Sequence, residues 1–113
     1  MLDKSIINII QNYLQEANKM GLQITEAVLF GSYAKGESDE DSDLDILLVC
    51  SDFQENSSEE IKNKLWSLRA NTDSRIEPIP IAEQEWSKGA GGIIADIARK
   101  EGVRISAPLK TNG

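Results

Sequence analysis

A short polar segment between two apolar runs limits what this chain can fold into more than any other feature of its sequence. The pair Gly31-Ser32 follows the apolar run that ends at Phe30, and ten residues later Asp43 and Asp45 lead into a second apolar run. Apolar runs bounded by polar, turn-forming residues are typical of buried strands. The pattern therefore predicts two strands joined by a tight turn and an acidic loop, with a carboxylate at the start of the second strand.

The two aspartates are separated by one residue, which places them on the same side of a strand, roughly 7 Å apart. Carboxylate oxygens are ligands that Mg²⁺ prefers in proteins. An acidic run is ordinarily a solvated loop. Asp45, however, is followed directly by a strongly apolar strand, where burial penalises a charge unless a metal or hydrogen bonds compensate it. The aspartates therefore favour a metal site that serves phosphoryl chemistry.

The Gly-Ser turn is expected to supply contacts to phosphate. Gly31 allows the backbone to approach a ligand closely, and Ser32 is predicted to cap a short helix over residues 33–35, whose free N–H groups would face an anion. Lys35 and Arg75 are the basic residues nearest to these motifs in the sequence. Each can supply the positive charge that a triphosphate needs, or can be an ordinary surface charge.

Two other motifs that contain clustered acidic residues or glycines do not fit this sequence. A calcium-binding loop that started at Asp39 would have Leu44 where the turn glycine is required, and one that started at Asp41 would have Ile46 there. The phosphate loop Gly-x-x-x-x-Gly-Lys-Ser/Thr does not occur in the sequence. Neither alternative therefore explains the acidic segment.

Periodicity and turn residues predict the remaining elements. Asp3 is expected to cap a first helix that ends near Gly21, and Ser57 with Glu60 forms a capping box for a later helix. A third strand contains two prolines, which lack a backbone donor, so this strand belongs at the edge of the sheet. The expected helices cover residues 3–21, 57–70, 83–86 and 93–100, and the expected strands cover residues 24–30, 44–50, 75–81 and 103–105. These elements predict an α/β (α+β) protein with a small mixed sheet of three to four strands flanked by helices.

Length and charge narrow the choice of function. The 113 residues fit one domain, expected over residues 1–106, followed by a flexible tail at 107–113. The formal net charge of −7 argues against a nucleic-acid partner, because affinity for nucleic acid comes mostly from basic residues. Cys50 is the single cysteine, Asp3 stands where a signal peptide would carry positive charge, and no apolar stretch is long enough to cross a bilayer. We therefore expect a cytoplasmic protein without membrane contact.

Gly31-Ser32, ten intervening residues and Asp43-Leu44-Asp45 resemble the signature of the nucleotidyltransferase superfamily related to DNA polymerase beta, in its shortest form, the minimal nucleotidyltransferase (MNT) domain. The resemblance implies the nucleotidyltransferase fold, ATP as substrate and two Mg²⁺ ions, which Mn²⁺ can replace. The implied catalytic and metal-binding residues are Asp43, Asp45 and Glu77, and the expected nucleotide-binding residues are Gly31, Ser32 and Lys35. Glu77 departs from the family, in which the third carboxylate is commonly Asp.

Stand-alone MNT domains resemble the antitoxins of HEPN–MNT toxin–antitoxin pairs. That likeness implies that the chain moves AMP from ATP to a tyrosine of a small helical HEPN-type partner and so silences it. Two alternatives stay open, namely transfer to a small molecule such as an aminoglycoside, and a weak or inactive module of the same fold that masks a helical partner by contact. The sequence also leaves open whether the chain forms a homo-oligomer.

Overall fold

The structure, a computed structural model, describes residues 4–39, 42–51 and 58–106. Three sequence predictions fall outside this part of the chain, namely the helix cap at Asp3, the capping residue Ser57 and the tail at 107–113. In chain order the elements are α1 (Lys4–Lys19), β1 (Ile24–Phe30), α2 (Ser32–Lys35), β2 (Leu44–Cys50), α3 (Ser58–Leu68), the 3₁₀ turn η2 (Arg69–Asn71), β3 (Ile76–Ala82), α4 (Glu83–Ser87), α5 (Ile93–Glu101) and β4 (Val103–Ile105).

The strands of the described chain form one four-stranded mixed sheet in the order β3-β2-β1-β4. β1 pairs with β2 and with β4 in antiparallel directions, whereas β2 and β3 are parallel. A parallel pair needs a crossover connection, and α3 provides it. The predicted mixed sheet is therefore confirmed, and so is the edge position of β3, the strand that contains Pro78 and Pro80.

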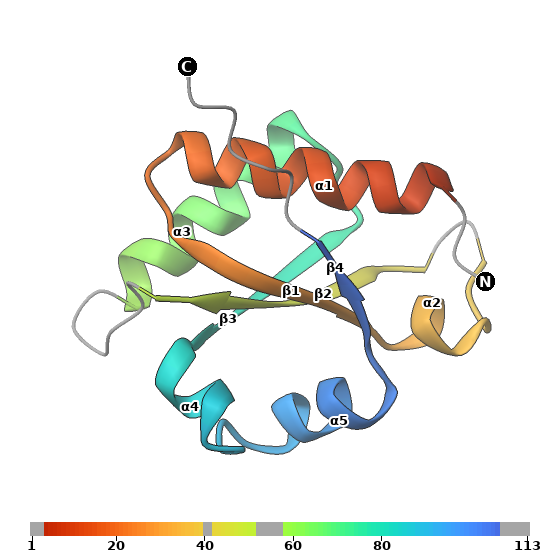
Figure 1. The fold of residues 1–113 in the computed structure, drawn as a ribbon. Coiled ribbons are helices and arrows are strands. Elements are labelled where there is room, and N and C mark those ends of the chain that lie inside the picture. The colour runs from red at the N-terminus through yellow and green to blue at the C-terminus, as the bar shows by residue number, and fades with distance from the viewer. Residues whose placement is uncertain (1–3, 40–41, 52–57, 107–113) are drawn as a thin grey trace.

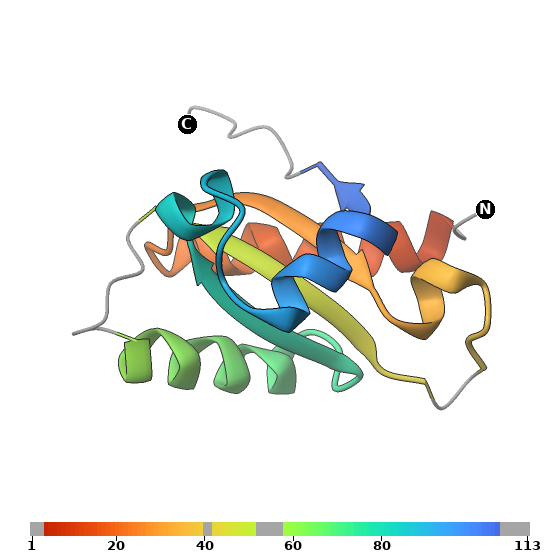
Figure 2. The same cartoon turned by 90° about the horizontal axis from the view of Figure 1, so that it is seen from below.

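Helices cover both faces of the sheet. Figure 1 shows α1 and α3 on one face with α4 and α5 on the other, and Figure 2 shows the α5 side from below. Six of the seven residues of β2 are buried, because this strand has a neighbour on each side and helices on both faces. Its apolar run from Ile46 to Cys50 is what such a central strand requires.

The larger half of the core lies between the sheet and the helices α1 and α3. Tyr13 is fully buried there, and its hydroxyl donates a hydrogen bond of 2.6 Å to the carbonyl of Leu65 in α3. Burial raises the pKa of Tyr13 above its ordinary value, so the hydroxyl remains a donor. The other buried residues of α1 recur at helical spacing along one face of this helix and are Ile6, Ile10, Leu14 and Ala17.

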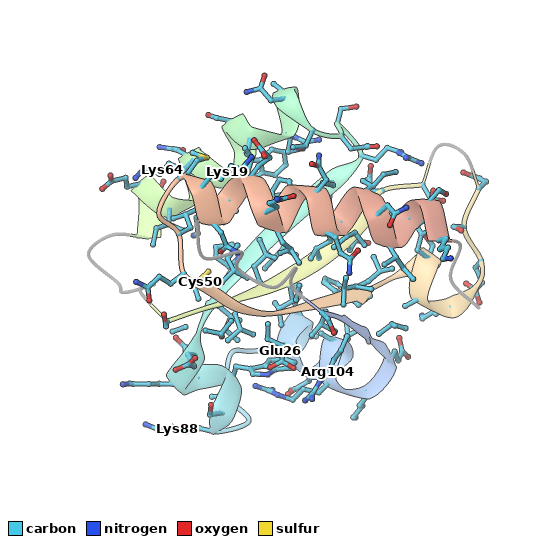
Figure 3. All side chains as sticks on the ribbon, turned by 45° about the horizontal axis from the view of Figure 1, so that its top comes forward. Lys19, Glu26, Cys50, Lys64, Lys88 and Arg104 are labelled. Atoms are coloured by element: carbon cyan, nitrogen blue, oxygen red, sulfur yellow. The ribbon has the colours of Figure 1, made fainter. Side chains whose placement is uncertain are left out.

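The smaller half of the core lies under α4 and α5. Two small residues of α5, Ala95 and Ala98, are buried against the sheet. Glu26 of β1 accepts a hydrogen bond of 2.9 Å from Trp86 Nε1 in α4 and pairs with Arg104 of β4 at 2.7 Å. Figure 3 shows Glu26 and Arg104 together at this side of the sheet. Glu26 therefore connects β1 to both α4 and β4.

Cys50, the single cysteine of the chain, is fully buried at the end of β2 (Figure 3). In the part of the chain that the structure describes, none of the helices has the length and apolar character needed to cross a membrane.

Several element boundaries differ from the sequence prediction by one or two residues, and at two of them a side chain binds the backbone nearby. The helix predicted to reach residue 70 ends as α3 at Leu68 and continues as η2, where the Thr72 hydroxyl donates a hydrogen bond of 2.9 Å to the Leu68 carbonyl. β3 begins one residue later than predicted, because the Asp73 carboxylate accepts a hydrogen bond of 2.9 Å from the backbone N–H of Arg75. Such local bonds compete with regular structure.

Replacement of Tyr13 by Phe tests the link between α1 and α3. The substitution keeps the buried ring and removes one buried hydrogen bond, so we expect the free energy of unfolding to fall by about 1 kcal/mol. Chemical denaturation measures this change. Tyr13→Leu, which also removes ring volume, should cost more, and an unchanged stability of Tyr13→Phe would contradict a role for the hydroxyl.

Candidate functional site

The structure brings the three predicted carboxylates together at one end of the sheet. In the parallel register of β2 and β3, Asp45 is the partner of Glu77. Asp43 lies two residues before Asp45, and the negative charges of both aspartates act on the Glu77 carboxyl group and raise its pKa. Because side chains alternate along a strand, Asp45 faces the same side as Leu47, which packs under α4 and α5. The carboxylates therefore open onto the α5 side of the sheet.

Burial and mutual repulsion shift the protonation of this cluster. Burial raises the pKa of Asp45; the hydrogen bond from Glu77 opposes this shift, and the charge of Asp43 adds to it. Burial likewise raises the pKa of Glu77, and the negative charges of Asp43 and Asp45 raise it further. The cluster therefore binds a positive charge more readily than an isolated carboxylate would.

A divalent cation can supply such a positive charge, because hard cations take carboxylate oxygens as ligands. Within the described ranges, no group of three Asp, Glu or Cys side chains is already arranged to hold a metal ion. The chemistry of the donor set nevertheless fits a metal, because Asp43, Asp45 and Glu77 supply the carboxylate oxygens that a hard cation takes as ligands.

Gly31 brings the turn after β1 directly against Asp45. Its backbone has φ 78° and ψ −152°, a conformation that is essentially restricted to glycine. A Cβ at this position would overlap Asp45 Oδ2. The sequence motif therefore has a structural reason, because only glycine can make this turn and leave the Asp45 carboxylate in place.

The predicted role of Ser32 as a helix cap is wrong. α2 begins at Ser32 itself, Gly31 occupies the capping position, and no side chain caps the helix. The glycine conformation places the first helical residue one position earlier than the sequence pattern suggested. The Ser32 hydroxyl is consequently not committed to capping α2.

The two basic residues considered for phosphate binding both have carboxylate partners. Lys35 Nζ lies 3.5 Å from Glu101 in α5, and both side chains are about half exposed. Arg75 is held more firmly, because its Nε and Nη2 donate to the Asp73 carboxylate at 3.1 and 3.0 Å. Asp73 in turn has a lowered pKa because of this bond. Arg75 is therefore fixed in place, whereas the exposed pair of Lys35 is weak.

Sequence reasoning missed Tyr33, which connects Arg75 to the acidic loop. The Tyr33 hydroxyl accepts a hydrogen bond of 3.3 Å from Arg75 Nη1 and donates one of 3.3 Å to the Asp39 carbonyl. Ser42 Oγ accepts a bond of 2.9 Å from the Asp39 N–H. These bonds fasten the segment before Asp43 to the start of β3. The spacing Asp73-x-Arg75 could have suggested the ion pair, but no local pattern indicates the contact with Tyr33.

A family model of the nucleotidyltransferase domain matches residues 7–90 of this chain. The chain belongs to this family. The matched segment includes the Gly31 turn and all three carboxylates, and the match confirms the enzyme class that the sequence motif predicts. No curated protein matches this nucleotidyltransferase domain in sequence.

Solved structures share the fold of this nucleotidyltransferase domain. A candidate nucleotidyltransferase of Sulfolobus solfataricus has a TM-score of 0.61 and 19% identity, over 92% of this chain and 82% of its own. A chain of a toxin–antitoxin MntA–HpeT variant has a TM-score of 0.53 and 23% identity, over 97% of this chain and 76% of its own. A chain of a toxin–antitoxin structure with AMP-PNP has a TM-score of 0.51 and 20% identity, over 88% of this chain and 75% of its own. At these identities the likeness confirms the predicted fold.

Gly31→Ala should lower the affinity for nucleotide more than it lowers the stability of the fold. The substitution strains the backbone and drives a methyl group into Asp45, so we expect loss of binding to AMP-PNP with Mg²⁺. Gly36→Ala is the matched control, because Gly36 also has a positive φ of 73° but has open space around a Cβ. It should lose about 1–2 kcal/mol of stability and keep its affinity. Calorimetric titration of the folded variants measures the difference, and equal affinities would refute the role of Gly31.

Proposed function

We propose that this domain transfers AMP from ATP to a hydroxyl group, with Mg²⁺ held by Asp43, Asp45 and Glu77. The observation that carries the proposal is the register of β2 and β3, which places Asp45 opposite Glu77 beside the Gly31 turn. A phosphate-binding turn next to clustered carboxylates suits phosphoryl transfer, which depends mainly on positioning and charge stabilisation. The raised pKa values of Asp45 and Glu77 support the same function.

Each residue has a definite task in this reaction. Bound Mg²⁺ supplies Lewis acidity and neutralises charge on the triphosphate. The chain would bind the terminal phosphates with the Ser32 hydroxyl and the backbone N–H groups after Gly31, where the missing side chain leaves room. A bond forms between the acceptor oxygen and the α-phosphorus while the bond to the β-phosphate oxygen breaks and pyrophosphate leaves. Glu77 is the carboxylate that would accept the proton of the acceptor hydroxyl.

We infer that the acceptor is a tyrosine of a helical HEPN-type partner protein. Two of the structural neighbours come from toxin–antitoxin complexes, one of them with the ATP analogue AMP-PNP. The net charge of −7 disfavours a nucleic-acid acceptor. A partner protein therefore fits this chain better than a nucleic-acid acceptor.

Intact mass spectrometry tests the proposal directly. When the chain is co-expressed with the protein encoded by the adjacent gene, we expect that protein to gain the mass of one or more AMP units. Asp43→Asn should abolish the gain, whereas Glu37→Gln, which changes an exposed carboxylate of the same loop, should preserve it. A stable complex with unmodified masses, neutralised equally well by the Asp43 variant, would favour a module that masks its partner by contact.

A further inference from the structure

An open apolar pocket lies beside the carboxylates, between the edge strand β3 and the start of α5. Its volume is about 640 Å³, and its apolar lining includes Leu47, Ile79, Ile93 and Ile94. Ile97 follows one turn after Ile93 on the same helix. We call the pocket together with the exposed side of α5, defined by these five residues, the α5 groove.

The floor of the α5 groove continues directly into the candidate site. Leu47 lies two residues after Asp45 on β2, and Ile79 lies two residues after Glu77 on β3. Residues two apart on a strand face the same side of the sheet. The carboxylates and the floor of the groove are therefore neighbouring parts of one surface.

The wall of the α5 groove is apolar and open to solvent. Ile93, Ile94 and Ile97 are 78%, 45% and 38% exposed. Ile94, Ile97 and Glu101 follow one another along one side of α5, and Glu101 contacts Lys35 of α2. Figure 2 shows α5 running across the sheet towards α2. The apolar wall thus extends from the pocket to the helix that begins at the phosphate-binding turn.

The lining of the α5 groove favours a polypeptide over a nucleoside. The described residues that line the pocket include no aromatic side chain on which a base could stack, whereas aliphatic side chains suit the aliphatic side chains of a protein. Three exposed isoleucines beside a pocket are typical of an interaction surface. A protein acceptor must also cover the surface around the carboxylates in order to bring its hydroxyl group to them.

Acidic residues at the two ends of the α5 groove indicate the charge of the segment that would bind there. Glu85 lies at the end formed by α4, and the cluster of Asp43, Asp45 and Glu77 lies at the other end, while Lys62 is the one basic residue among the described lining. We propose that the α5 groove docks the acceptor protein through an amphipathic segment, in which an aliphatic stripe is flanked by Lys or Arg. This inference rests on the proposed function, because it concerns the acceptor of the same site.

Surface substitutions separate acceptor docking from nucleotide binding. Ile94→Gln combined with Ile97→Gln removes exposed apolar area of the wall. Met20→Gln is the matched control, since Met20 is 41% exposed and lies in the turn after α1. Against the protein encoded by the adjacent gene, we expect the double variant to raise Kd and KM by about tenfold, as loss of interface anchors does. Its kcat at saturating acceptor and its affinity for AMP-PNP with Mg²⁺ should stay unchanged, as should all values for Met20→Gln.

Each other outcome has a definite meaning. An unchanged Kd for the double variant overturns the inference, and a parallel loss of AMP-PNP affinity overturns it by showing that the groove holds the nucleoside. If the wild-type chain binds the adjacent-gene protein without modifying it, the proposed function fails, while a weakened Kd of the double variant still supports docking. Absence of any complex with the wild-type chain overturns the inference as well.

Discussion

Parallel pairing of β2 with β3 is the constraint on which the candidate site depends. It sets Asp45 against Glu77, two carboxylates that are 32 positions apart in the sequence. The crossover helix α3 makes the parallel direction possible. Core contacts with α1, including the hydrogen bond from Tyr13 to the Leu65 carbonyl, hold α3 against the sheet. The repulsion between the carboxylates is therefore opposed by packing that lies behind the sheet, away from the site itself.

The prolines of β3 allow this pairing and protect its open edge. The Arg75 carbonyl accepts a hydrogen bond of 2.8 Å from the backbone N–H of Leu44 in β2. In a strand, alternate residues direct their backbone groups to the same side, so Glu77 and Ile79 also turn theirs toward β2. Pro78 and Pro80 then occupy the outward positions, where a missing donor costs no ladder bond and discourages pairing with another chain.

The sequence predicts much of this fold because its central strands are unambiguous. The apolar runs 24–30 and 44–50 become β1 and β2 with the predicted bounds, and the two prolines indicate the edge position of β3. The motif also identifies the turn and carboxylates that the structure brings together, whose catalytic roles remain predictions. The prediction that Ser32 caps α2 is wrong, because a residue pattern does not show the positive φ of Gly31.

Long-range contacts are the other part that sequence reasoning could not supply. Tyr33 and Arg75 are 42 residues apart, and their hydrogen bond depends on the sheet register rather than on local spacing. The same holds for the α5 groove, in which residues of β2, β3 and α5 become neighbours only after folding. Periodicity indicates which side of α5 is apolar, but it does not show that the exposed part of that side adjoins the carboxylates.

The central claim is that the clustered carboxylates hold a divalent cation together with the nucleotide, and thermal unfolding tests it most directly. The melting temperature should rise by several degrees in Mg²⁺ with AMP-PNP relative to AMP-PNP with a chelator, because ligands that bind only the folded state stabilise it. In Asp45→Asn, which keeps the shape of the side chain and removes its charge, this rise should be lost. Equal melting temperatures of the wild-type chain in the two conditions would contradict the claim.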